Sequence, residues 1–519
     1  MHATPESKVP NQAMRYPTPL WFAAYMLVLG MSFTSVVRAS PGAPDPSFGS
    51  GGLVATFFPG TTSTEVAHAV ALQADGKLVA AGSAGSGCGI ARYLSDGTAD
   101  PSFGYQGKAY DCRLRETWAV SLQPDGKIVI VGASLVTGSP SGVDFAVVRF
   151  NADGSPDTGF GSAGLVITDI PGGDTFDVAY GVAIQPDGKI VVSGTADAGA
   201  NDCACVVRYL PDGTLDTFFG SGTGIVVFDA SSGGAGHCET RVALQPDGRI
   251  VLGGYLGGGW IGAFAARLNS DGSLDTGFNG TGKRGWMEPG STDERMHALA
   301  LLPDGRILLA GANDGNGTRT FIVWRVSPDG ATIAGARFSY GTEVAEAYGM
   351  AVQSDGKIEL AGSTAADAGA TTPTHFELMR VTTDWLADAT FDAPQSRTVT
   401  GAFPAPVSGT PTGLALQPDG KVVVVGGSEA NGGECVIVRY DTRGNLDRSF
   451  GSGGITATNF SSLADKWMRV TLQPDGRILV CGAKQLTPTK HVTVVARFDS
   501  SGQLDTAFGS NDLTHDRHG

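Results

Sequence analysis

Arginine and aspartate recur at a constant spacing along this chain of 519 residues. An arginine holds the same place in eight repeated segments, and in seven of them an aspartate follows eight residues later. Such groups form charge-assisted, bidentate hydrogen bonds, so the pairs could bind a polar ligand or tie the chain to itself. We favour the structural role, because a binding site rarely needs so many copies. The pairs are Arg92–Asp100, Arg149–Asp157, Arg208–Asp216, Arg267–Asp275, Arg380–Asp388, Arg439–Asp447 and Arg497–Asp505.

Three aromatic side chains in a glycine-rich stretch are the candidate ligand-binding residues. Tyr255, Trp260 and Trp286 could stack on a sugar ring or grip a protein partner, because aromatic rings offer a large contact surface with a polar edge. Packing between neighbouring repeats is the alternative, and we favour it for each of them.

Five of the seven cysteines are the main candidates for disulfides. Cys88 and Cys112 flank one expected hairpin almost symmetrically, which suits a cross-strand disulfide. Cys238 could pair with Cys203 or Cys205. Each bond would restrain a long loop and stabilise the fold by about 2–4 kcal/mol.

The two remaining cysteines, Cys435 and Cys481, could pair across neighbouring repeats, which leaves one thiol over. The Cys-x-Cys at 203–205 has no second cysteine pair and no histidine cluster, so we predict no metal there. The Asp-Gly turns lack the D-x-D-x-D-G run of a calcium loop.

Catalytic signatures are also absent from the sequence. It contains no G-x-S-x-G elbow, no H-E-x-x-H and no P-loop, so we predict no catalytic residue and no cofactor. We expect four scattered histidines, His68, His237, His297 and His375, to be ordinary polar residues. The net charge of −15 argues against binding to nucleic acid or to an anionic membrane, which requires clustered Lys and Arg.

One repeated sequence unit forms the strands and turns that must position these residues. Each copy has an apolar run, an Asp-Gly turn, a β-branched run ending in Gly seven residues after the Asp, and a second hairpin that carries the arginine. Asp and Gly at the turn suit a tight hairpin, and four strands per copy are typical of a propeller blade. We therefore predict an all-β propeller of four-stranded blades, with eight blades favoured over seven. The turn aspartates are Asp75, Asp125, Asp187, Asp247, Asp304, Asp355, Asp419 and Asp475.

The two ends of the repeat region predict a closed ring. Residues 45–49 and the expected strand Gly52 to Phe58 form the second half of a repeat that has no first half. The eighth repeat stops at Gly509 without a fourth strand. The N-terminal strand can supply this missing strand, and closure of this kind removes an exposed sheet edge.

Two motifs that recur in fixed order carry a family resemblance. Leu122–Lys127 (LQPDGK) and Arg208–Gly213 (RYLPDG) resemble the delta-60 repeats of bacterial β-propellers. The resemblance implies a propeller on an exported or surface protein and no characterised activity. The fifth repeat departs from the pattern, because Ile333 stands in the place of the aspartate and Arg325 must find another partner. The sixth repeat ends in Phe391-Asp392, and these departures keep seven blades open.

The N-terminus has the pattern of a signal peptide. Lys8 and Arg15 precede the apolar run Leu20 to Val37, and small residues suit cleavage after Ala39. An uncleaved membrane anchor is the alternative. We therefore predict a signal peptide at 1–39, a propeller at 40–509 and a polar tail at 510–519, in a periplasmic or extracellular, monomeric protein without a membrane span.

The predicted function depends on the loops whose length varies from repeat to repeat. The tight turns of all blades share one face, and the loops of changing length share the other, which we call the variable-loop face. Variable loops on a rigid scaffold usually carry the binding residues. We expect a module that binds a protein or a carbohydrate on this face. An enzyme with a site in the central channel and a structural envelope component without a ligand are the alternatives.

Overall fold

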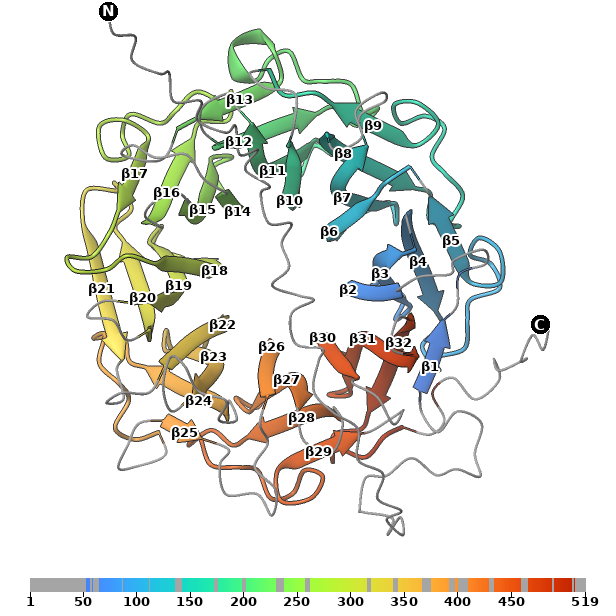
Figure 1. The fold of residues 1–519 in the computed structure, drawn as a ribbon, viewed down its shortest axis with the longest axis vertical. Coiled ribbons are helices and arrows are strands. Elements are labelled where there is room, and N and C mark those ends of the chain that lie inside the picture. The colour runs from blue at the N-terminus through green and yellow to red at the C-terminus, as the bar shows by residue number, and fades with distance from the viewer. Residues whose placement is uncertain are drawn as a thin grey trace, which may run out of the picture. The chain divides into compact units, whose positions relative to one another are not determined.

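Each repeat folds into one four-stranded antiparallel sheet, and the sheets follow one another around an axis (Figure 1). The computed structural model describes residues 53–508 except 57, 59–64, 86, 112, 136–141, 172–175, 198–201, 230–237, 257–261, 315–318, 339–343, 366–374, 392–396, 400–408, 429–433, 459–464, 488–489 and 506–507. These described residues form eight sheets, so the prediction of eight blades is confirmed and the alternative of seven is wrong.

The first four blades each contain four consecutive strands, ordered from the axis outward. Blade 1 has β2 (Glu65–Leu72), β3 (Leu78–Ala84), β4 (Gly87–Tyr93) and β5 (Lys108–Asp111). Blade 2 has β6 (Glu116–Leu122), β7 (Ile128–Leu135), β8 (Val143–Phe150) and β9 (Leu165–Thr168). Blade 3 has β10 (Val178–Ile184), β11 (Ile190–Asp197), β12 (Asp202–Tyr209) and β13 (Ile225–Phe228), with the short 3-10 turn Gly220–Gly222 before β13. Blade 4 has β14 (Cys238–Leu244), β15 (Ile250–Leu256), β16 (Gly262–Leu268) and β17 (Lys283–Trp286).

The last four blades include the two degenerate repeats and the closing blade. Blade 5 has β18 (Glu294–Leu301), β19 (Ile307–Asn313), β20 (Thr320–Val326) and β21 (Ile333–Phe338). Blade 6 has β22 (Val344–Val352), β23 (Ile358–Ala365), β24 (His375–Val381) and β25 (Arg397–Val399). Blade 7 has β26 (Gly409–Leu416), β27 (Val422–Ser428), β28 (Glu434–Tyr440) and β29 (Ile455–Thr458). Blade 8 has β30 (Lys466–Leu472), β31 (Ile478–Thr487), β32 (Lys490–Phe498) and, as its outer strand, β1 (Leu53–Thr56).

The pairing of β1 with β32 closes the ring as the sequence predicted. The strands are antiparallel, with Leu53 opposite Ala496 and Thr56 opposite Thr493. The sheet of blade 8 therefore contains chain segments from both ends of the repeat region.

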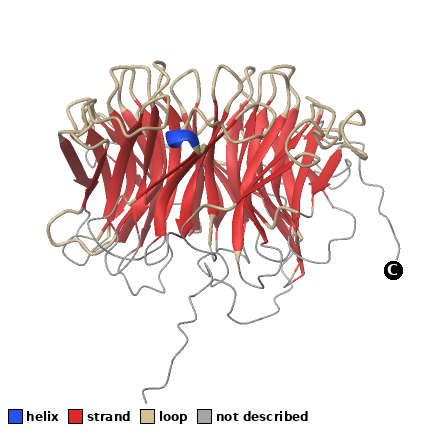
Figure 2. Cartoon of the chain, turned by 90° about the horizontal axis from the view of Figure 1, so that it is seen from above, coloured by secondary structure: helices blue, strands red, loops and turns tan. Residues whose placement is uncertain are grey.

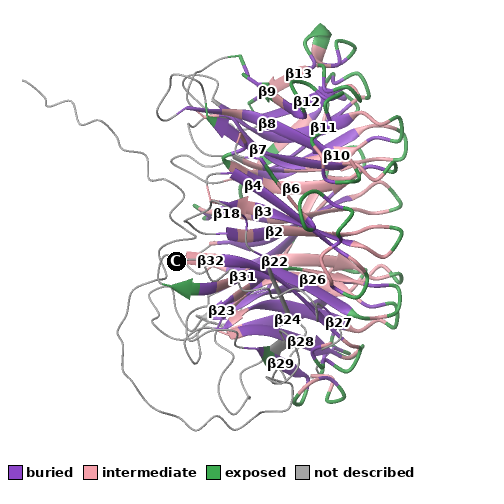
Figure 3. Cartoon of the chain, turned by 90° about the vertical axis from the view of Figure 1, so that its right-hand side faces the viewer, coloured by how far each residue is buried: buried purple, intermediate pink, exposed green. Residues whose placement is uncertain are grey.

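The tight turns form because Asp and Gly satisfy the local backbone. In blade 2, Gly126 has a φ of 84°, which a residue with a side chain rarely adopts, and the Asp125 carboxylate accepts the backbone N–H of Lys127 at 3.2 Å. The turns gather at one face, opposite the variable-loop face (Figure 2). Figure 3 shows that they are exposed while most of the strands are buried.

The core lies between neighbouring blades. Val131 and Phe145 of blade 2, for example, share one buried cluster with Val192 and Val207 of blade 3. The middle strands of the blades, such as β7 and β8, are therefore buried on both sides, and this explains the uninterrupted β-branched runs of the repeat.

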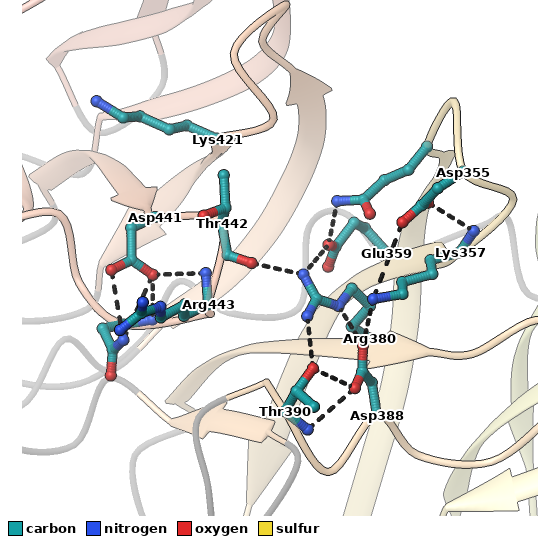
Figure 4. Close-up of polar contacts among 12 residues, drawn as sticks. Asp355, Lys357, Glu359, Arg380, Asp388, Thr390, Lys421, Asp441, Thr442 and Arg443 are labelled. Atoms are coloured by element: carbon teal, nitrogen blue, oxygen red, sulfur yellow. Dashed lines mark hydrogen bonds and ion pairs between the residues drawn. The ribbon is translucent and has the colours of Figure 1, made fainter.

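An arginine–aspartate pair stabilises the second hairpin in seven of the eight blades. In blade 6, Arg380 Nε donates to Asp388 Oδ2 at 2.8 Å, and Asp388 Oδ1 accepts the backbone N–H of Thr390 at 3.0 Å (Figure 4). One carboxylate oxygen thus accepts from the guanidinium and the other accepts from the backbone of its own turn. The expected bidentate pair, in which both oxygens bind the guanidinium, is wrong. The same Nε–Oδ2 contact, at 2.7 to 2.9 Å, joins Arg92–Asp100, Arg149–Asp157, Arg208–Asp216, Arg267–Asp275, Arg439–Asp447 and Arg497–Asp505.

The same arginine also reaches the next blade, a contact that the spacing did not predict. Arg380 Nη1 donates to the Thr442 carbonyl oxygen of blade 7 at 2.6 Å, and its guanidinium lies 4.5 Å from the centre of the Phe391 ring. One side chain therefore holds its own hairpin, its own Phe and the neighbouring blade. The equivalent contacts are Arg92 to Ala152, Arg208 to Ser270, Arg267 to Pro328, Arg439 to Ser500 and Arg497 to Ser95.

Blade 5 lacks this aspartate, and Arg325 instead stacks on an aromatic ring of blade 6. Its guanidinium lies 4.7 Å from the centre of the Trp385 ring. Trp385 has a φ of 67° and holds the turn position that Gly444 holds in blade 7, where a Cβ would press against the Phe391 ring. Blade 6 therefore supplies the aromatic partner that the degenerate repeat of blade 5 does not contain.

One buried carboxyl group makes stability depend on pH. Glu359 is fully buried beside Arg380, and burial, which the charge of Arg380 opposes, raises the pKa of this carboxyl to about 8. The folded chain then binds this proton more tightly than the unfolded chain does, so Glu359 favours folding most below its ordinary pKa of 4.5. The equivalent residues are Val79, Val129, Val191, Val251, Leu308, Val423 and Leu479.

We expect Glu359→Leu to stabilise the protein, and more so as the pH rises from 5 to 8. The gain should grow by up to about 1.4 kcal/mol per pH unit and level off above pH 8, where the carboxyl is ionised in both states. Denaturant unfolding of both proteins at pH 5 to 9 measures this difference. Glu359→Gln keeps the shape without the titration and should show the same pH trend. A gain that does not change with pH would contradict the prediction.

Candidate functional site

A β-bulge recurs in the innermost strand of seven blades. The extra residue always lies seven positions before the turn aspartate, and bulges of this kind redirect a side chain. In blade 4, β14 pairs with β15 without such a shift. The bulged residues are His68, Trp118, Tyr180, His297, Tyr348, Thr412 and Met468.

The glycine seven residues after each turn aspartate makes room for a carbonyl group of the innermost strand. In blade 2, a Cβ on Gly132 would overlap the carbonyl oxygen of Glu116 in the neighbouring strand. This also holds in blade 4, which has no bulge, where a Cβ on Gly254 would overlap the carbonyl oxygen of Glu239. The β-branched run ends in glycine because a side chain at this position would collide with that carbonyl group.

Bulged side chains of adjacent blades meet around the axis and form two arcs. In the first arc the ring centres of His68 and Trp118 are 6.5 Å apart, and those of Trp118 and Tyr180 are 5.2 Å apart. In the second arc His297 lies 5.3 Å from Tyr348, and Tyr255 of β15 lies 6.4 Å from His297. We call these six residues the axial ring: His68, Trp118, Tyr180, Tyr255, His297 and Tyr348.

The first arc offers an unused donor and a neutral imidazole. The indole N–H of Trp118 is buried and has no hydrogen-bond partner among the described residues. Burial and the charge of Arg469 lower the pKa of His68 to about 4, so its ring is neutral at pH 7. This arc therefore combines flat rings with polar groups and carries no charge of its own, and His68 Nε2 lies 3.2 Å from Ser83 Oγ.

The second arc is held by a buried carboxylate. Glu346 Oε1 lies 2.8 Å from His297 Nε2, and Oε2 accepts from the Tyr348 hydroxyl at 3.2 Å and from Arg319 at 3.3 Å. Burial opposes ionisation, but the bond from His297 and the nearby arginines lower the pKa of Glu346 to about 2. Arg319 also donates to Asp293 at 2.6 Å, so this network joins blades 5 and 6.

The predicted aromatic site is not a single cluster. Tyr255 and Trp286 both pack against the core between blades 4 and 5, and the rings of Trp286 and Trp324 are 6.1 Å apart. Of these two residues, Tyr255 alone also belongs to the axial ring. Trp260 lies outside the described residues. The predicted alternative of packing between blades therefore describes Trp286 better than ligand contact does.

The sequence reasoning missed the axial ring. It treated His68 and His297 as ordinary polar residues and did not single out Trp118, Tyr180 or Tyr348. Aligning the repeats on their turn aspartates would have placed these side chains in one column of the sequence. The bulge that turns them toward each other comes from strand pairing.

The five cysteines whose side chains the structure describes, Cys88, Cys203, Cys205, Cys435 and Cys481, are buried in strands. Cys88 is a free thiol, and Cys112 lies outside the described residues. The expected Cys435–Cys481 pair is wrong, because Cys435 faces the core between blades 7 and 8 and Cys481 faces the core between blades 8 and 1. Burial raises the pKa of the Cys481 thiol to about 12. Cys203 and Cys205 are buried in β12, and their pairing with Cys238 stays a prediction because the structure does not describe that side chain.

One group of carboxylates has the spacing of a metal site. Oxygen atoms of Asp144, Asp169 and Asp177 lie within 4.8 Å of one another. Asp177 accepts the backbone N–H of Ile170 at 2.9 Å, which gives this buried carboxylate a structural role as well. The sequence analysis did not single out these three residues, because they come from a strand and a connection between two blades.

The fold and the axial ring define an eight-bladed β-propeller with aromatic residues around its axis. The family model described as "Domain of unknown function (DUF5122) beta-propeller" matches residues 73–103, 123–160, 185–219, 245–278, 302–332, 353–391, 417–450 and 473–508. These segments make up more than half of the chain, which therefore belongs to this β-propeller family. The predicted membership of a propeller repeat family is confirmed, while the delta-60 name stays a prediction.

Several solved structures match this chain at low sequence identity. Prolyl oligopeptidase B from Galerina marginata is 12% identical with a TM-score of 0.41, and the match covers 81% of this chain and 55% of that chain. This chain thus spans about half the length of that protein. Sqt1 from Chaetomium thermophilum is 15% identical over 75% of this chain and 82% of that chain, with a TM-score of 0.41. A polysaccharide lyase of family PL25, an ulvan lyase, is 12% identical over 90% and 96% of the two chains, with a TM-score of 0.39. No curated protein matches the sequence.

No helix within the described residues is long and apolar enough to cross a membrane.

Proposed function

We propose that the protein is an exported binding module that takes a carbohydrate at the axial ring. The observation that carries the proposal is the contact of bulged aromatic residues from consecutive blades, above all Trp118 with Tyr180. Flat rings pack well against the apolar faces of sugars, and polar groups beside them fix the orientation of a ligand. The bulged residues lie in the first half of the innermost strands, which begin at the variable-loop face. We therefore assign the binding site to the axial ring.

A glycan-binding screen with the full chain tests this proposal. Trp118→Ala should weaken binding of any captured glycan at least tenfold, about 1.4 kcal/mol. Phe218→Ala is the matched control, because Phe218 is an aromatic residue that is 86% exposed at the tight-turn face. Trp118→Phe, which keeps a ring in place, should retain most of the affinity. Equal binding by the wild type and Trp118→Ala, in a variant that unfolds at the same denaturant concentration, would overturn the proposal.

A catalytic role is the second candidate, and the His297–Glu346 pair favours it. An ionised carboxylate that accepts a hydrogen bond from an imidazole N–H fixes the orientation and tautomer of the ring, as in enzymes that use histidine as a base. If this candidate is correct, glycans that bind should be cleaved, and His297→Ala should abolish cleavage without abolishing binding. If bound glycans stay intact after prolonged incubation with the wild type, the catalytic candidate is wrong and only the binding function remains.

A further inference from the structure

The innermost strands carry a second column of residues, six positions before the turn aspartate. Six blades have Ala or Gly there, whereas blades 4 and 8 have Arg241 and Arg469. These two blades lie opposite each other across the axis, as β14 and β30 show (Figure 1). The small residues are Ala69, Ala119, Gly181, Ala298, Gly349 and Gly413.

The small residues reflect close packing between inner strands. A Cβ on Gly181 would lie 2.7 Å from Ser193 Oγ and 3.2 Å from Val242 Cγ1 of the next blade. A Cβ on Gly413 would lie 3.3 Å from Val470 Cγ1 of blade 8. A long side chain has no space between the blades at this position, so we infer that Arg241 and Arg469 extend toward the axis.

Neither arginine is well neutralised by the protein. Arg469 is exposed and donates to two carbonyl oxygens, those of Met468 at 2.8 Å and Thr412 at 3.3 Å. No carboxylate of the described residues lies within ion-pair distance of it. Arg241 donates to the Thr240 carbonyl oxygen at 3.3 Å, its ion pair with Glu239 is long at 3.7 Å, and over a third of its side chain is exposed.

The positive charges act on each other and on their surroundings. The surrounding inner strands desolvate the Arg469 guanidinium although part of its surface is exposed, and this desolvation lowers its pKa. Cys481 opposes the shift, and the charge of Arg241 adds to it. Arg469 likewise lowers the pKa of His68 in the axial ring, after burial as the larger cause. A positive site thus lies on the axis of a chain with a net charge of −15.

We propose that Arg241 and Arg469 together bind an anionic group, a carboxylate or a sulfate, on the propeller axis beside the axial ring. Guanidinium groups suit both anions, because their planar donors match the oxygen atoms of carboxylate and of sulfate or phosphate. An anion between two arginines from opposite blades would relieve their mutual repulsion. Together with the proposed function, on which this part rests, the site selects an acidic carbohydrate over a neutral one.

Calorimetric titration of the full chain with sodium sulfate, glucuronate and glucose tests the anion site. Sulfate and glucuronate should bind saturably at constant ionic strength, and Arg469→Ala and Arg241→Ala should each weaken them at least tenfold. Arg469→Gln provides a second variant in case the alanine change affects folding, which the unfolding midpoint reports. Arg448→Ala is the matched control, because Arg448 is an exposed arginine at the tight-turn face.

The outcomes separate the anion site from the carbohydrate function. Saturable sulfate binding that depends on both arginines supports the site even if no sugar binds, and in that case the carbohydrate proposal fails. Glucuronate that binds more tightly than both sulfate and glucose supports an acidic sugar as the ligand. No saturable binding of sulfate or glucuronate, or equal affinity in folded Arg469→Gln, would overturn the anion site. Binding of neutral glycans that Trp118→Ala weakens would still support the carbohydrate function in that case.

Discussion

A chain that lacks residues 1–58 is expected to lose a large part of its stability and to self-associate. The deletion removes β1 and Phe58, whose buried ring lies so close to Gly89 that a Cβ there would be 2.5 Å from it. Loss of a buried Phe alone costs about 3–5 kcal/mol. The deletion also exposes the edge of β32, and an unpaired edge strand can pair with another chain.

Urea unfolding and size-exclusion chromatography measure the two effects of this deletion. Deletion of residues 1–52 is the matched control, because it leaves β1 and Phe58 in place and should keep the unfolding midpoint of the full chain. A 59–519 chain that is monomeric and as stable as the 53–519 chain would show that β1 does not close the ring in solution.

Gly132→Ala is expected to be the most damaging single methyl group that can be added to blade 2. The new Cβ would overlap the Glu116 carbonyl oxygen beside the bulge, and a backbone group cannot rotate away as a side chain can. Overpacking of this kind costs about 3 kcal/mol or more. Because the bulge places Trp118, the variant should also change the environment of that indole. A lower urea midpoint and a shifted tryptophan emission spectrum are the expected results.

Gly159→Ala is the control for this prediction. Gly159 is exposed and its Cβ would meet nothing closer than an Asp157 oxygen at 3.3 Å. Other blades already carry Ser102, Phe218 and Thr390 at this position. We therefore expect little change in stability, and equal losses in the two alanine variants would contradict the role assigned to Gly132.

The blade itself could be predicted from the sequence because its signals are local. The Asp-Gly turn, the β-branched run and the fixed glycine lie within one repeat. Each copy therefore predicts the same hairpin independently of the others. Degenerate repeats still pair their strands, as β21 and β25 show, because ladder hydrogen bonds and apolar packing tolerate the loss of one turn motif. The count of eight was therefore predictable despite Ile333 and the altered end of the sixth repeat.

The candidate site and the other contacts between blades were less predictable, because the residues that meet there come from different repeats. The spacing of Arg380 and Asp388 predicts their proximity, but the contact with Thr442 depends on how two blades pack. Trp385 replaces an aromatic partner missing from the preceding blade, and no motif within its own repeat indicates this.

The sequence by itself determined an all-β propeller, its repeat unit, its eight copies and its closure by an N-terminal strand. Turn chemistry and hydrophobic patterning act over a few residues, and repetition makes them unambiguous. Only the tertiary structure decided which side chains meet around the axis. Closure brings together residues as distant as Arg497 and Ser95, 402 positions apart. Ring geometry, which no single repeat encodes, also sets β14 opposite β30, the strands that carry Arg241 and Arg469, and joins Trp118 to Tyr180.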